Sequence, residues 1–148
     1  MKNNIIRLIL ILITAIWIFG FSYNSFFPDT PEATALNPII KKFYSNVCHQ
    51  DDGKLCLING HKLLVCPRCA GIYLGIFAGI VFSFIFKSPI KLKILILSGV
   101  LILLDVVLTT FDVYDYSKHF AFVTGLFFGI SLFLYIQDVI FKIFTRKV

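Results

Sequence analysis

Charged side chains are scarce in this chain of 148 residues: Asp, Glu, Lys and Arg make up 15%, whereas soluble domains carry about 25%. Hydrophobic residues make up 58%, and the mean hydropathy is +0.88. A soluble domain of this length cannot keep so much apolar surface away from water. The scarcity of charge therefore excludes a soluble globular protein. It indicates one integral membrane domain, residues 1–148, whose main partner is the lipid bilayer.

Motifs of several common enzyme and binding classes are also missing. The sequence has no phosphate-binding Gly loop, no nucleophile elbow and no paired carboxylates, so it gives no sign of hydrolysis. It has no Cys-x-x-Cys-His haem attachment motif. The net charge is +6, but the basic residues form no aromatic-interleaved patch, which argues against nucleic acid as a partner. Enzyme activity stays open, with the weight of the sequence against it.

Four apolar stretches are present, at about residues 8–23, 70–86, 92–111 and 120–141. Since about 20 apolar residues cross a hydrocarbon core, we predict an all-α integral membrane protein with about four transmembrane helices. The first stretch follows Lys2 and Arg7, as in a signal peptide. The small-residue cleavage signal after it is poor, so we expect a retained helix.

The basic residues also predict the orientation. They gather at the N-terminus, between the second and third stretches and in the tail: Lys2, Arg7, Lys87, Lys91, Lys93, Lys142, Arg146 and Lys147. Positive charge stays on the cytoplasmic side, so we place both termini in the cytoplasm and the chain in the cell (inner or cytoplasmic) membrane. Residues 24–69 then form an extracytoplasmic cap, in a compartment that favours disulfides.

The cap begins with a predicted helix. Asn37-Pro38 is typical of a helix start. Apolar residues follow at helical spacing: Ile39, Ile40, Phe43, Tyr44 and Val47. We expect either a short amphipathic helix at the membrane interface or a buried helical turn. In both cases it delivers Cys48 and His49.

A hairpin is expected next, because Asn59-Gly60 lies between two apolar runs. The hairpin returns the chain and brings Cys66 back near Cys48. Cys66-Pro67-Arg68-Cys69 then opens the second membrane helix. The positive end of a helix favours a thiolate over a thiol.

These residues resemble a known family. The sequence from Cys48 is similar to that of the bacterial membrane proteins called domain of unknown function 2085, in the segments Cys48-His49-Gln50, Asn59-Gly60 and Cys66-x-Arg68-Cys69-x-Gly71-Ile72-Tyr73-x-Gly75. The resemblance covers about residues 40–130 and includes Asp105 and Thr124-Gly125…Gly129. It implies the membrane architecture, but no activity, because the family has none established.

The chain departs from the family pattern at two places. The family has Arg-Ser-Phe where this chain has Lys54-Leu55-Cys56, which puts Cys56 outside the shared pattern. It has an Arg where this chain has Ala121, so no role of that Arg carries over.

The cysteines fit three kinds of chemistry. The first is a metal site, most plausibly zinc, with Cys48, Cys66 and Cys69 as thiolates and His49 as the fourth ligand, in a structural or ligand-binding role. The fourth ligand has three alternates, Cys56, His61 and His119, and water can also leave it open.

The second kind is thiol–disulfide exchange with a quinone, as in four-helix membrane oxidoreductases. Cys66 and Cys69 would then be catalytic, and Cys48 and Cys56 would form the second pair. The third is a pair of inert disulfides that staple the cap. We take the metal site as the first hypothesis, the oxidoreductase as the second and the inert disulfides as the third.

Asp105 lies about one and a half turns below the outer end of the third membrane helix. A charge at that depth costs several kcal/mol unless it is paired or faces a polar cavity. Arg68 opens the second membrane helix at the same side, so we expect an Arg68–Asp105 ion pair that anchors the cap to the bundle. A proton or ion relay is the alternative.

Glycines recur at four-residue spacing in two helices: Gly71, Gly75 and Gly79, and Gly125 and Gly129. Such faces let membrane helices approach closely. We expect the second membrane helix to pack on the fourth, or against a second copy in a homo-oligomer.

Overall fold

The structure is a computed structural model, and it describes residues 2–26, 31–48, 55, 57–58, 61–85, 90–111 and 115–146. The helices are α1 (Lys2–Phe26), α2 (Pro31–Ser45), α3 (Pro67–Phe82), α4 (Leu92–Thr110) and α5 (Lys118–Arg146). Two short strands, β1 (Leu57–Ile58) and β2 (His61–Lys62), pair antiparallel. The all-helical class with a small cap is therefore confirmed.

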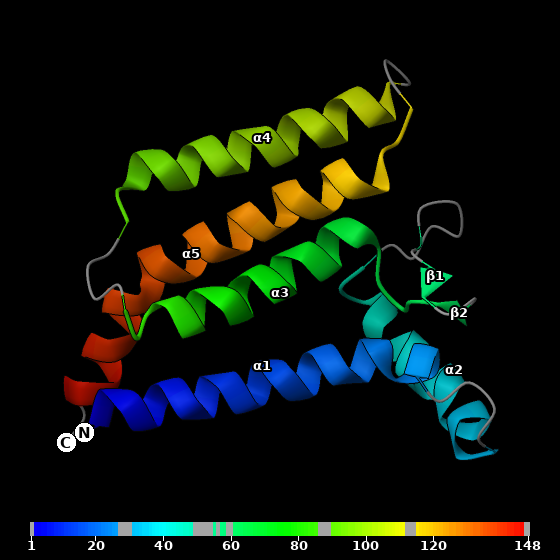
Figure 1. Cartoon of the computed structure of the whole chain (residues 1–148), viewed down its shortest axis with the longest axis horizontal. Helices are drawn as coiled ribbons and strands as arrows, with labels where there is room; N and C mark the ends of the chain where they lie inside the picture. The colour runs from blue at the N-terminus through cyan, green and yellow to red at the C-terminus, as the bar shows by residue number, and fades with distance from the viewer. Residues whose placement is uncertain are drawn as a thin grey trace.

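Four helices run alongside one another in the order α1, α3, α5, α4, with both termini at one end (Figure 1). The short helix α2 and the hairpin lie at the other end. Three helices are long and apolar enough to cross a membrane: α1, α4 and α5. At 16 residues, α3 is shorter, but it packs between α1 and α5.

Apolar side chains cover the outside of this bundle. On α1, Leu8, Leu12 and Ile16 are 59%, 63% and 65% exposed, and on α4, Leu103 is 61% exposed. Such exposure is costly in water and costs nothing in hydrocarbon. The faces that carry these residues therefore face lipid.

The helices α3 and α5 approach so closely that only glycine fits between them. A Cβ on Gly71 would collide with the carbonyl oxygen of Phe122, and one on Gly75 would lie 3.0 Å from the Cα of Gly129. From the other side, a Cβ on Gly125 would collide with the carbonyl oxygen of Arg68. Gly79 packs in the same way, since its Cβ would lie 3.0 Å from the Cβ of Phe133. The glycine faces of α3 and α5 thus meet within one chain. Each covers the other, so neither is exposed to a second copy.

One predicted boundary is wrong. The cap helix begins at Pro31 and not at Asn37, and Pro38 lies inside it. Two prolines in this segment are each typical of a helix start, and the helix begins at the first. Between them the chain reads Glu-Ala-Thr-Ala-Leu-Asn, in which Glu, Ala and Leu are strong helix formers that carry the helix up to Pro38.

The hairpin has the expected register. Leu57 pairs with Lys62 and Ile58 with His61, so two residues connect the strands. That connection is Asn59-Gly60, the predicted turn, which lies outside the described residues. The return of the chain places Leu63, Leu64 and Val65, all buried, against Phe21 of α1.

Candidate metal centre

The first turn of α3 positions two of the cysteines. Cys66 is the N-cap residue, with extended backbone angles (φ −70°, ψ 159°), and Pro67 occupies the first helical position. The amide of Ala70 donates to the carbonyl of Cys66 at 2.9 Å, which begins the helix. The Cys66 side chain caps no backbone amide, so its sulfur can face the sulfur of Cys69 one turn further on.

The third cysteine arrives from the end of α2. The backbone amide of Cys48 donates to the carbonyl of Tyr44 at 3.0 Å. Tyr44 is buried, and its hydroxyl donates to the carbonyl of Trp17 on α1 at 2.8 Å. Cys48 itself is 5% exposed. The link between α1 and α2 thereby fixes the position from which the Cys48 sulfur reaches α3.

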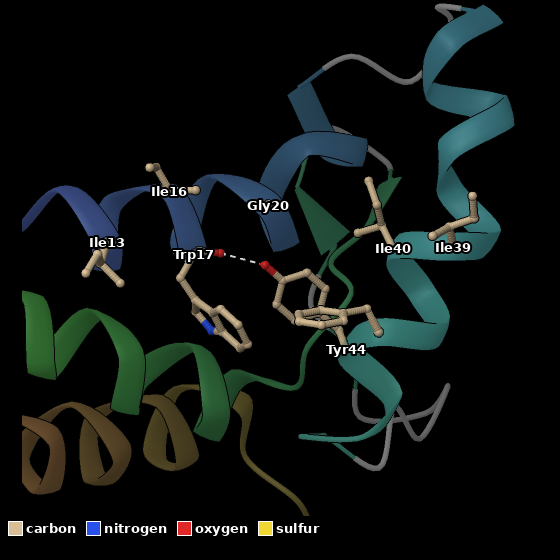
Figure 2. Close-up of a pocket in the computed structure, with 8 residues that line it drawn as sticks. Ile13, Ile16, Trp17, Gly20, Ile39, Ile40 and Tyr44 are labelled. Atoms are coloured by element: carbon tan, nitrogen blue, oxygen red, sulfur yellow. Dashed lines mark hydrogen bonds between the residues drawn. The ribbon is translucent and has the colours of Figure 1, made fainter.

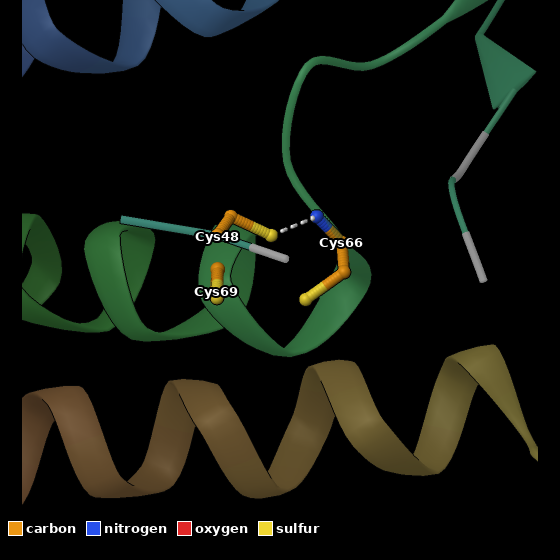
Figure 3. Close-up of side chains that lie close together, drawn as sticks. All are labelled: Cys48, Cys66 and Cys69. Carbon is orange, nitrogen blue, oxygen red and sulfur yellow. Dashed lines mark hydrogen bonds between the residues drawn. The ribbon is translucent and has the colours of Figure 1, made fainter. Parts of the chain in front are cut away.

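The ligand atoms of these three cysteines lie together (Figure 3). All three Sγ atoms are within 4.8 Å of one another. The backbone amide of Cys66 donates to the Sγ of Cys48 at 3.2 Å. Among the described residues, no disulfide joins these three cysteines. An amide hydrogen bond to sulfur stabilises the charged form of that sulfur.

This arrangement fits a tetrahedral metal ion. Zinc binds thiolate sulfur at about 2.3 Å, which places two sulfurs of one tetrahedron about 3.8 Å apart. Side-chain rotations can draw three sulfurs within 4.8 Å onto those edges. A trio of soft donors with one open or separately filled position is typical of zinc and excludes calcium and magnesium, which take oxygen ligands.

The neighbouring sulfurs and the burial of Cys66 oppose the thiolate that we expected at the helix start. A side-chain hydrogen bond with Cys48 raises the pKa of the Cys66 thiol, one with Cys69 lowers it, and burial raises it, so that the net direction is upward. Three neighbouring sulfurs cannot all carry negative charge without a cation among them. A bound metal ion would replace these protons.

The other predicted ligands are placed differently. His49 and Cys56 lie outside the described residues. For His61 only the backbone in β2 is described. His119 lies at the start of α5 with an exposed side chain, and the group that could hold a metal does not include it. The fourth ligand therefore stays a prediction.

Arg68 and Asp105 contact each other beneath the cysteines. The Nε of Arg68 donates to Oδ2 of Asp105 at 2.9 Å, and its Nη2 contacts the same oxygen. The Asp105 side chain is fully buried, whereas the Arg68 side chain is 19% exposed. The guanidinium also lies 5.8 Å from the ring centroid of Tyr116. The pair joins the start of α3 to the last third of α4.

Two features near the cysteines were not predicted. An aromatic layer of Trp17, Phe21, Tyr44 and Tyr73 packs against the cluster, with ring centroids 5.1–6.1 Å apart. In addition, the Nζ of Lys118 on α5 donates to the carbonyl of Leu55 at 2.8 Å. The aromatic residues of α1 and α3 near the cap were the available sequence signal, since such rings favour a membrane interface. The contact between Lys118 and Leu55 had no sequence signal.

Comparison with known proteins is consistent with these features. A family model described as "Predicted membrane protein (DUF2085)" matches residues 48–135, more than half of the chain. The protein "Uncharacterized protein MJ1492" of Methanocaldococcus jannaschii is 31% identical over 153 residues, which cover 99% of this chain and 97% of that protein. No solved structure matches. The family match begins at Cys48, the first of the three clustered cysteines.

Proposed function

Since the chain belongs to the family of predicted membrane proteins called domain of unknown function 2085, we propose that it is a membrane metal-binding protein with a zinc site at the outer end of α3. Cys48, Cys66 and Cys69 are the thiolate ligands. The observation that carries the proposal is that the three sulfurs lie within 4.8 Å of one another, although Cys48 and Cys69 are 21 positions apart in the chain. His49 follows the first ligand directly and is our choice for the fourth.

The bound ion would cross-link the end of α2 to the start of α3. A closed site with four protein ligands acts in this structural way, whereas a site with an open position can bind a further ligand and polarise it. The proposed site combines three fixed sulfurs with one position filled from the loop after Cys48. Its role is therefore structural or ligand-binding.

We place this site outside the cell membrane's hydrocarbon core, on the extracytoplasmic side. Four crossings by α1, α3, α4 and α5 would leave both termini in the cytoplasm, which is supported by the common end at which they lie (Figure 1). The basic flanks Lys2, Lys91, Lys93 and Arg146 lie at the two chain ends, just before α4 or in its first turn. Their position favours the same orientation.

Metal content tests the proposal directly. In the purified full-length chain we expect about one zinc ion per chain by elemental analysis. Thiol titration should find the clustered cysteines protected, and free once the metal is chelated. Metal-free protein with a reversibly reducible Cys66–Cys69 bond would instead support the second candidate, a thiol–disulfide oxidoreductase that uses a quinone. That candidate rests on the Cys-x-x-Cys spacing at the start of α3.

The Arg68–Asp105 pair is proposed to anchor the cap to the bundle. Asp105→Asn removes the charge that the Arg68 guanidinium faces. Breaking a fully buried pair costs about 3–5 kcal/mol, and because Arg68 is 19% exposed, we expect a loss of about 2 kcal/mol in the free energy of unfolding. We also expect faster release of zinc to a chelator.

Asp115→Asn is the matched control, because Asp115 is exposed at the surface. It makes the same chemical change and should alter neither property. Thermal unfolding in detergent and chelator kinetics measure both effects. Wild-type stability and metal retention in Asp105→Asn would exclude the anchoring role.

A further inference from the structure

An apolar groove of about 540 Å³ separates the outer end of α1 from α2 (Figure 2). Its volume lies within the range of about 300–1,000 Å³ that is usual for ligand sites. Both helices line it, through Ile13, Ile16, Trp17, Gly20, Ile39, Ile40, Phe43 and Tyr44. The groove is distinct from the cysteine cluster, which lies at the start of α3.

Specific contacts hold the walls of the groove in place. The Tyr44 hydroxyl donates to the carbonyl of Trp17, as the dashed line in Figure 2 shows. This approach needs Gly20, because a Cβ there would collide with the hydroxyl. The Trp17 ring makes edge contacts with Phe43, Tyr44 and Tyr73, with centroids 5.6, 5.1 and 5.7 Å away. The groove is thus a built feature and not a gap between loosely placed helices.

The chemistry of the lining selects an apolar occupant. Among the described lining residues, Tyr44 carries the one side-chain hydroxyl, which is already bonded to Trp17, and the indole Nε1–H of Trp17 is a single buried donor without a partner. A buried water needs two to four polar partners, which this lining does not offer. A second hollow of about 190 Å³ continues from Ile13 and Trp17 to Tyr73 and Ile76 of α3. The combined space follows α1 into the bundle, which suits an extended hydrocarbon chain.

Positive charge lies beside the groove, in a neighbouring hollow on α2. A third hollow, of about 480 Å³, shares Ile39 and Phe43 with the groove and is also lined by Lys42. Lys41 and Lys42 are both exposed on α2. Among the described side chains of α2, residues 38–45, none is acidic. An ammonium group beside an apolar groove complements a phosphate joined to an acyl chain.

We propose that this groove binds one anionic phospholipid, with an acyl chain between α1 and α2 and its phosphate at Lys42. The acyl chain continues along Trp17 toward Tyr73 and Ile76. The site is independent of the proposed metal centre. It differs from the general lipid contact of the exposed α1 face because two helices line it and a lysine lies in the adjoining hollow.

The single tryptophan of the chain makes the site directly observable, because Trp17 lines the groove. The full-length protein is reconstituted into vesicles of zwitterionic phospholipid with a small fraction of phospholipid that has brominated acyl chains, which quench tryptophan. We expect brominated phosphatidylglycerol to quench Trp17 about fivefold more effectively than brominated phosphatidylcholine at the same fraction, which corresponds to about 1 kcal/mol for one lysine.

Paired variants separate the headgroup from the groove. Lys42→Gln should abolish the preference for the anionic lipid, whereas Lys93→Gln, the same change at the exposed start of α4, should keep it. Ile16→Phe fills the groove and should reduce quenching by both brominated lipids. Leu12→Phe is its control, because Leu12 is 63% exposed on α1 and does not line the groove.

Equal quenching of the wild-type protein by the two brominated lipids would overturn the proposal. Unchanged selectivity in Lys42→Gln would do the same. A copurifying isoprenoid quinone without any preference for the anionic lipid would also overturn it, since the groove would then hold a different class of occupant.

Discussion

Cys66→Ser is expected to lose its zinc. Cys66 contributes one of three sulfurs that lie within 4.8 Å of one another, and its backbone amide also donates to the Sγ of Cys48. Loss of a residue that merely orients a metal ligand lowers affinity about 10- to 100-fold; loss of the ligand itself should cost more than about 100-fold. Competition with a chelator of known affinity measures the change, and elemental analysis should find little zinc in the purified variant.

Cys56→Ser provides the comparison for this result. Cys56 falls outside the family pattern and outside the described residues, and we expect its replacement to leave zinc content unchanged. The comparison also separates the two candidate functions, because the oxidoreductase would pair Cys56 with Cys48. Equal zinc content in Cys66→Ser and the wild-type protein would contradict the metal centre.

The folded bundle should be lost in Gly75→Ala. The added Cβ would collide with the carbonyl oxygen of Leu126 and lie 3.0 Å from the Cα of Gly129. Both obstacles are backbone atoms of α5, so no side chain can rotate away. Overpacking commonly costs about 1–3 kcal/mol, and we expect more than about 3 kcal/mol here, because α3 and α5 must separate along their length. Unfolding in detergent and the yield of monodisperse protein report this loss.

Gly99→Ala is the matched control for that substitution. Gly99 is also a glycine inside an apolar helix, α4, but a Cβ there would lie 3.6 Å from Cε2 of Phe128, at an ordinary contact distance. The same change should therefore stabilise the protein by about 0.5–1 kcal/mol, since alanine has a higher helix propensity than glycine. Similar effects of the two substitutions would show that α3 and α5 are not in close backbone contact.

Several features could be read from local sequence. Apolar runs predicted the helices because a chain in lipid must satisfy its backbone hydrogen bonds within each helix. Cys66-Pro67-Arg68-Cys69 predicted the start of α3 because proline is favoured at the first helical position. The depth of Asp105 relative to Arg68 followed from the helical rise alone.

Other features depended on contacts between distant segments. The start of α2 could not be chosen from local signals, because Pro31 and Pro38 are both typical of helix starts. The groove forms where the Tyr44 hydroxyl donates to the Trp17 carbonyl, 27 residues away in the chain. This contact requires Gly20, because a Cβ there would collide with the hydroxyl.

The cysteine cluster combines both kinds of information. Its Cys66–Cys69 half was determined by the sequence, since one helical turn fixes the distance between these residues. The addition of Cys48 was expected from the hairpin, but its position was decided by tertiary structure: Tyr44 docks on α1 and the paired strands return the chain to α3. Local spacing sets distances within one element, whereas the distance between elements is set by the packing of the side chains that join them.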